Sequence, residues 1–187
     1  MTYTKISADA FQELQLNAGV LLSTFNPATP AAPADTDIIC TTSGGISVTC
    51  APTFSDFGED VDNCPNNLME FKHLDGWDCS MAFTNIRFNQ ANIALALGAA
   101  DKTGATKVTP RAELNTSDFT DLWWVGDKTD GGAVAIKLIN ALSTGGFSMQ
   151  TTKNAKGTMA MTITGHVSKD AQDVVPMEFY VLAAPTP

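Results

Sequence analysis

The sequence predicts a mainly β protein, an antiparallel β-sandwich or barrel with one flanking α-helix. Several segments alternate apolar and polar residues with a period of two, which is typical of half-buried strands. Turn-rich connections separate these segments, which favours antiparallel pairing. One segment has helical periodicity instead, and its apolar stripe must pack against a sheet. With 187 residues, the chain is expected to form a single domain spanning residues 1–187.

The most regular strand pattern covers residues 77–83, and the helix is expected soon after it. The apolar side of this strand comprises Trp77, Cys79, Met81 and Phe83. Asn89 is expected to cap the helix, because its side chain can accept a hydrogen bond from a free N–H group of the first turn. Gly98 marks the helix end. The expected apolar stripe of the helix comprises Ile93, Ala96, Leu97 and Ala100.

The N-terminal part of the chain predicts shorter elements. Residues 8–16 are expected to form one or two helical turns, and residues 19–22 a short apolar strand. Residues 27–37 are rich in proline and alanine and predict a flexible, exposed arm, because proline fixes φ and removes a backbone donor.

Residues 38–50 predict a hairpin that turns at Gly44 and Gly45, because glycine readily adopts positive φ. This hairpin would place Cys40 opposite Cys50. In a cytosolic protein, two small buried hydrophobic side chains are favoured over a redox pair.

Residues 51–76 form the longest irregular stretch, which predicts a long acidic loop. Connections of this length in a compact domain are usually functional or mobile. Asp56-Phe57-Gly58 matches a kinase metal motif, but the other kinase motifs do not accompany it. Residues 60–63 are similar to a calcium loop, but the glycine and closing glutamate of an EF-hand are missing. We therefore expect a solvated acidic loop without a metal.

The C-terminal part predicts mostly strands. They cover residues 122–125, 133–141, 157–167 and 177–181, and their apolar positions include Met159, Met161, Ile163, Val167, Met177, Phe179 and Val181. In residues 157–167 the other side is rich in threonine, and such a hydroxyl-rich face suits the lining of a wet channel. Trp123 and Trp124 must point to opposite faces, so one indole is expected to be buried and the other near a surface. Burial of both within the subunit is the alternative.

The composition limits the classes of partner. The chain has 20 Asp and Glu residues and 11 Lys and Arg residues, which gives a formal net charge of −9. A high-affinity nucleic-acid binder normally has a basic face, whereas an acidic surface lets DNA pass without sticking. No segment approaches the ~20 consecutive apolar residues of a membrane span, so no membrane partner is expected. The first residues lack a signal-peptide pattern, so we expect a cytosolic site of synthesis and reduced cysteines.

The sequence offers no catalytic pattern. It lacks a Gly-x-Ser-x-Gly elbow, a phosphate-binding glycine loop and a His-Glu-x-x-His motif. His73 and His166 are far apart in sequence, and the cysteines lack the Cys-x-x-Cys spacing of a zinc site. We therefore expect a protein that is not an enzyme and uses no cofactor or metal.

Five segments together span roughly residues 6–181 and point to a family. They are FQELQLNAGVLL (11–22), FSDFGEDVDNCP (54–65), LWWVGD (122–127), NALSTGGF (140–147) and AQDVVP (171–176). In these segments the chain resembles the major tail tube proteins of long-tailed (siphovirus-type) bacteriophages. The proline-rich arm and the cysteines are outside this resemblance.

The resemblance implies a structural virion protein that self-assembles, with six copies forming a ring and stacked rings forming the tail tube. Double-stranded DNA would only be in transit through the lumen during ejection. The other partners would be the tape measure, terminator and initiator proteins of the tail. The protein would be assembled in the host bacterial cytoplasm and would reside in the virion tail.

Within this resemblance, residues 51–76 are the expected inter-ring stacking loop. The interface residues that we expect are Asp56, Phe57, Glu59, Asp60, Trp123 and Trp124. The alternative function from another class is a monomeric ligand-binding β-sandwich, such as a carbohydrate-binding module that stacks a sugar on Trp123 or Trp124.

Overall fold

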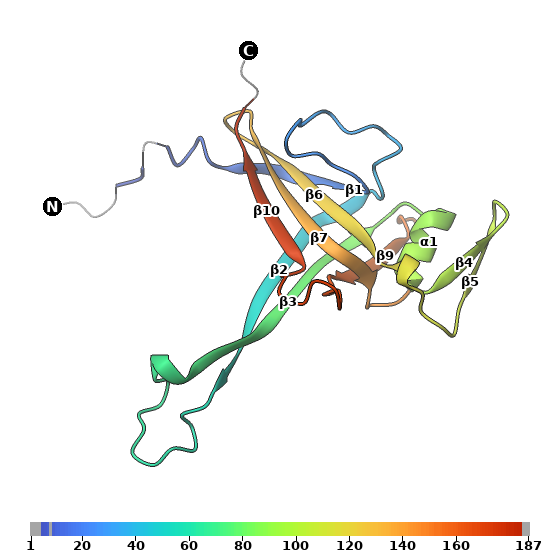
Figure 1. The fold of residues 1–187 in the computed structure, drawn as a ribbon. Coiled ribbons are helices and arrows are strands. Elements are labelled where there is room, and N and C mark those ends of the chain that lie inside the picture. Colours follow the sequence, from blue (N-terminus) through green and yellow to red (C-terminus); the bar gives the residue numbers. More distant parts are fainter. Residues whose placement is uncertain (1–4, 8, 185–187) are drawn as a thin grey trace.

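The structure, a computed structural model, describes residues 5–7 and 9–184 and confirms the predicted antiparallel, sandwich-like β fold with one α-helix (Figure 1). The strands in this part of the chain are β1 (Gln15–Leu22), β2 (Thr42–Asp56), β3 (Lys72–Asn85), β4 (Ala100–Thr103), β5 (Lys107–Pro110), β6 (Thr120–Lys128), β7 (Ala133–Ser143), β8 (Ser148–Gln150), β9 (Thr158–Thr164) and β10 (Met177–Leu182). The helices are α1 (Gln90–Leu97) and the 3-10 turns η1 (Met69–Phe71) and η2 (Thr116–Asp118).

Two layers share strand β7. Its first part pairs with β10 on one side and β6 on the other, and β6 pairs with β1. Its last residues, Leu142 and Ser143, pair instead with β9, from which the sheet continues to β3 and β2. Figure 1 shows β6, β7 and β10 crossing over β2 and β3. The strand β7 therefore leads the chain from one layer of the sandwich into the other.

The hydrophobic core lies between the two layers. Its fully buried side chains include Leu21, Met81, Leu138, Met159 and Ile163, each exposed by 1% or less. These residues occupy alternate positions of their strands, as a period of two predicts. Since burying one such side chain contributes about 1.5–3 kcal/mol, these positions hold the two layers together.

Some predicted apolar positions lie at the surface instead. Trp77, Val167, Phe179 and Val181 are exposed by 38%, 50%, 59% and 73%. Phe179 and Val181 belong to the edge strand β10, and Trp77 lies where β3 leaves the body of the protein. The alternation predicts which face a side chain takes, but it does not predict how far the opposite layer extends.

The helix α1 begins and ends where the sequence predicts. The Asn89 side chain accepts a hydrogen bond from the Asn92 N–H (2.7 Å), and Gly98 follows the last turn at φ 73°. The predicted apolar stripe is wrong in part, because the fully buried helix residues are Asn92 and Ala96. The side-chain N–H of the buried Asn92 donates to the Arg87 carbonyl (3.0 Å), whereas its Oδ1 has no hydrogen-bond partner among the described residues.

The N-terminal elements differ from the prediction. Residue 8 lies outside the described residues, and from residue 9 onward the expected helical turns reduce to one turn, in which the Glu13 N–H donates to the Asp9 carbonyl. The predicted strand at 19–22 is confirmed and begins earlier, at Gln15. Residues 27–37 form an exposed loop that returns to the sheet, where the Ser23 N–H donates to the Asp37 carbonyl (2.9 Å).

The hairpin predicted at residues 38–50 is wrong. Gly44 and Gly45 do have positive φ (85° and 82°), but they lie within β2, where the pairing with β3 skips between Thr42 and Ile46. Glycine therefore makes a bulge here and not a turn. As a result Cys50 faces Cys79 across the strands, while Cys40 is buried elsewhere in the core.

Candidate assembly surfaces

A long two-stranded ribbon projects from the sandwich (Figure 1). We define the ribbon as residues 51–78, which comprise the outer halves of β2 and β3 and the connection between them. The prediction of an irregular loop at 51–76 is therefore corrected at both ends, because β2 continues to Asp56 and β3 starts at Lys72. Apart from Gly58, every residue of the ribbon is exposed or half-buried, so neither of its faces is covered.

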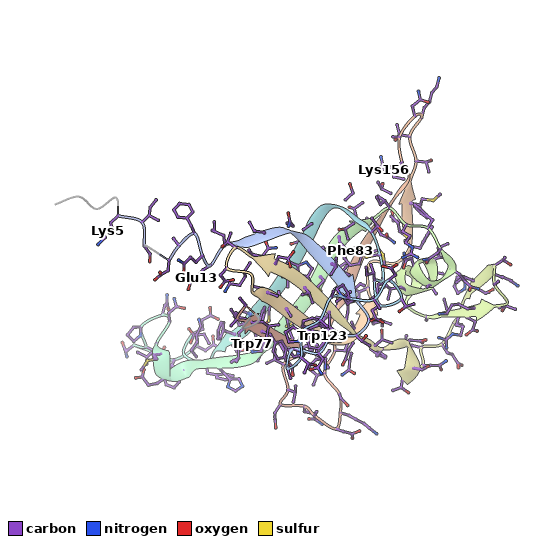
Figure 2. All side chains as sticks on the ribbon, turned by 90° about the horizontal axis from the view of Figure 1, so that it is seen from above. Lys5, Glu13, Trp77, Phe83, Trp123 and Lys156 are labelled. Atoms are coloured by element: carbon purple, nitrogen blue, oxygen red, sulfur yellow. The ribbon has the colours of Figure 1, made fainter. Side chains whose placement is uncertain are left out.

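The ribbon exposes large apolar side chains. They are Phe54 (52%), Phe57 (65%), Val61 (48%), Met69 (79%), Phe71 (38%), Leu74 (44%) and Trp77 (38%). Figure 2 labels Trp77, which lies where the ribbon leaves the body. An isolated two-stranded hairpin is marginally stable in water, and exposed apolar clusters typically mark interaction surfaces. The ribbon therefore has the properties of a surface that a partner covers.

The tip of the ribbon is built by its own contacts. The Phe57 N–H donates to the Phe71 carbonyl (3.1 Å), and the Asp56 carboxylate accepts from the Gly58 N–H (3.0 Å). A Cβ on Gly58 would lie 3.0 Å from the Cys64 sulfur and 3.1 Å from the Phe71 ring. The close packing around Gly58 gives the tip a defined shape, which a specific contact surface needs.

Four of the predicted interface residues meet at this tip. Phe57, Glu59 and Asp60 are exposed, and the Phe57 ring lies 5.9 Å from that of His73. Asp56 is less accessible, because its carboxylate faces Gly58 and lies 4.0 Å from the Lys72 ammonium group. The structure thus brings these four residues together, but whether they contact another subunit stays a prediction.

Trp123 and Trp124 lie elsewhere, in β6, and they point to opposite faces of the sheet as predicted. The expectation that one of them lies near a surface is wrong, because they are exposed by only 7% and 9%. The Trp124 indole N–H donates to the Ala18 carbonyl (3.0 Å) within the main core. Trp123 packs on the other face between Phe25 and Tyr180, at ring distances of 5.6 and 5.5 Å. Neither indole offers a face for a sugar or a partner subunit.

The outer face of the layer formed by β2, β3 and β9 is rich in hydroxyl groups. Across these three strands, Thr49 lies opposite Ser80 and Ser80 opposite Thr164, while Ser47, Ala82 and Thr162 form the next row. The Thr164 and Thr144 hydroxyl groups are 2.7 Å apart. We call this set the hydroxyl face, comprising Ser47, Thr49, Ser80, Ala82, Thr162 and Thr164. It presents a polar, uncharged surface on the side of the sheet away from the core.

Strand β10 forms a second apolar surface that the sequence reasoning did not identify as a candidate site. It pairs only with β7 among the described strands, which leaves its other edge open. Its residues Phe179 and Val181 are strongly exposed. An open edge with apolar side chains is suited to pairing with another strand. The alternation of residues 177–181 was visible in the sequence, but nothing in it identified an edge.

The two histidines of the chain have different surroundings. His166 is engaged with the Asn140 carbonyl (3.2 Å) and the Phe119 ring, while His73 lies on the ribbon. A groove of about 660 Å³ beside α1 is lined by Arg87, Lys102 and other residues, among which there is no histidine or cysteine. Within the described part of the chain, no group of three or more His, Cys, Asp or Glu side chains could hold a metal.

Over residues 5–7 and 9–184, no helix has the length and apolar character needed to cross a membrane. No protein-family model matches the chain, and no curated protein matches it either.

Proposed function

We propose that this protein is a structural virion protein whose copies assemble into stacked rings, with six per ring, to form the tail tube of a long-tailed bacteriophage. The observation that argues most strongly for self-assembly is the ribbon at residues 51–78, which exposes seven large apolar side chains on two strands with no covering layer. The tube would conduct double-stranded DNA during ejection and would contact the tape measure, terminator and initiator proteins of the tail. These partners and the ring number derive from the sequence resemblance.

In this proposal the ribbon of one subunit packs against a subunit of the next ring. Burying apolar surface contributes about 25 cal/mol per Å², so covering the exposed side chains of the ribbon would stabilise the stack. The ribbon also has seven acidic residues and one lysine, Lys72. This charge keeps free subunits soluble and disfavours the association of two ribbons with each other.

Strand edges and the hydroxyl face would form the ring and its lumen. The open edge of β10 would pair laterally with a strand of a neighbouring subunit, and this pairing would also remove an exposed edge. The hydroxyl face would line the lumen, because uncharged hydroxyl groups present no cations to bind the phosphates of DNA. The net charge of −9 would also disfavour binding of DNA to the tube, because it repels the phosphates.

The tip of the ribbon can be removed without cutting into the body. Asp56 and Lys72 are partners in the β2–β3 register, so a two-residue Asn-Gly turn can replace residues 57–71 and keep the strands paired. This removes four of the seven exposed apolar side chains of the ribbon, namely Phe57, Val61, Met69 and Phe71. We expect this variant to keep its secondary structure and thermal unfolding transition but to lose assembly. Far-ultraviolet circular dichroism and sedimentation velocity measure the two properties.

A matched control shortens a different hairpin. Thr103 and Lys107 are partners at the ends of β4 and β5, so residues 104–106 can be replaced by the same Asn-Gly turn. This variant should assemble as the wild-type protein does. Normal rings or tubes from the variant without residues 57–71 would overturn the proposed role of the ribbon.

A further inference from the structure

A pair of cysteines lies where the ribbon joins the sandwich. Cys50 of β2 and Cys79 of β3 face each other directly in the register, and their sulfur atoms are 2.9 Å apart. Both are free thiols in the structure. Cys79 is the first buried residue after the ribbon, exposed by 1%, while Cys50 is half-buried. We propose that Cys50 and Cys79 are an oxidation site, at which a small-molecule disulfide converts the two thiols into an intramolecular disulfide that closes the ribbon at its base.

The geometry favours this bond. Directly opposed residues of an antiparallel pair have their side chains on the same face, which directs both sulfur atoms to the same point. An S–S bond is about 2.0 Å long, so the two sulfur atoms need to approach by about 0.9 Å from their separation of 2.9 Å. The two other cysteines are placed differently: Cys64 is on the ribbon tip, and Cys40 belongs to a segment that does not pair with β3.

The reaction is a thiol–disulfide exchange in two steps. The Cys50 sulfur, which is the more accessible, attacks the small-molecule disulfide as a thiolate and releases one small thiol, leaving a mixed disulfide on Cys50. The Cys79 thiolate then attacks the Cys50 sulfur and releases the second small thiol. The protein loses two electrons and two protons, and the reagent gains both. Reduction by a dithiol reverses the sequence.

The environment of Cys79 makes the second step slow at neutral pH. Burial, together with the hydrogen bond between the Cys79 and Cys50 thiols, raises the pKa of the Cys79 thiol to about 12. Because the thiolate is the attacking species, the fraction of reactive Cys79 increases as the pH rises towards this pKa. A reducing cytosol keeps protein thiols reduced, so the bond is expected in an oxidising medium, and it forms faster as the pH rises. This inference concerns a single chain and holds whether or not the proposed tube forms.

The test uses the full chain incubated with oxidised glutathione at pH 9, followed by acid quenching and peptide mass spectrometry. We expect the mass of two hydrogen atoms to be lost, a linked peptide pair containing Cys50 and Cys79, and loss of both signals after treatment with dithiothreitol. The closed loop contains 28 residues between the two cysteines, and constraining it is expected to raise the unfolding midpoint by about 10 °C.

Matched variants separate this pair from the other thiols. Cys64→Ser should behave as the wild-type protein does, whereas Cys50→Ser and Cys50→Ala should form no intramolecular bond. Both a serine and an alanine variant are made at this half-buried position, so that a folding defect in one of them does not decide the result. A Cys50 that stops as the glutathione mixed disulfide, or a linked pair that contains Cys40 or Cys64, would overturn the proposal.

Discussion

At the scale of single residues, buried amides fix the chain where β3 leads into the helix. Asn85 is fully buried; its side-chain Oδ1 accepts from the Arg87 N–H (2.9 Å) and its side-chain N–H donates to the Arg87 carbonyl (3.0 Å). Asn92 donates to the same carbonyl from the helix. These bonds satisfy backbone groups in a segment without regular pairing, so they hold α1 against the sandwich.

Replacing Asn85 with alanine tests this arrangement. Asn85→Ala leaves the Arg87 N–H without its partner, which we expect to cost about 1–3 kcal/mol in the free energy of unfolding. Urea denaturation followed by circular dichroism measures the change. The exposed Asn66→Ala on the ribbon is the control and should alter stability by less than about 0.5 kcal/mol. Equal effects of the two substitutions would contradict the assigned role of Asn85.

The tryptophans give a second prediction at this scale. Trp77 is exposed by 38%, against 7% and 9% for Trp123 and Trp124. Iodide should therefore quench mainly Trp77, and Trp77→Phe should remove most of the iodide-accessible emission. Assembly should also protect Trp77, because it lies at the base of the ribbon. Iodide quenching that is unchanged in Trp77→Phe would show that an indole of β6 is accessible instead.

At the scale of elements, the sequence predicts best those strands whose two faces have different surroundings. In β9, Met159, Met161 and Ile163 are buried and alternate with less buried positions, and the predicted period of two is confirmed. The ribbon strands were missed because both of their faces are exposed, so burial imposes no alternation on their residues. Their polar composition is also typical of a loop.

Two other predictions, the hairpin at residues 38–50 and an indole of β6 near the surface, were wrong for different reasons. Gly44 and Gly45 have the positive φ that a hairpin turn needs, but positive φ also suits a bulge, and only the pairing of β2 with β3 distinguishes the two. Trp123 is buried because Phe25 and Tyr180, distant in sequence, cover the outer face of β6. Long-range coverage of this kind has no local sequence pattern, so the candidate site could be predicted at the ribbon tip but not in β6.

At the scale of the whole molecule, the sandwich has two outer sides with different surfaces. One side is the hydroxyl face, and the other is covered by Phe25 and the adjoining loop at residues 26–37. In the proposed tube the first side lines the lumen and the second faces outward.

Cysteine labelling tests this orientation. In a Cys64→Ser background, Thr162→Cys places a thiol on the hydroxyl face and Thr29→Cys places one on the exposed outer loop. A maleimide linked to a bulky polymer should label both in free subunits, but only the Thr29 position in assembled tubes, as peptide mass spectrometry can show. Equal labelling of the Thr162 position in tubes and in free subunits would contradict a lumenal hydroxyl face.

Self-assembly into a tube can be observed directly by electron microscopy of the purified protein in negative stain across a range of concentrations. We expect hollow rings or tubes of uniform diameter that become more abundant as the concentration rises, because association follows mass action. Dispersed monomers at every concentration, for the wild-type protein as for the variant that lacks residues 57–71, would contradict it.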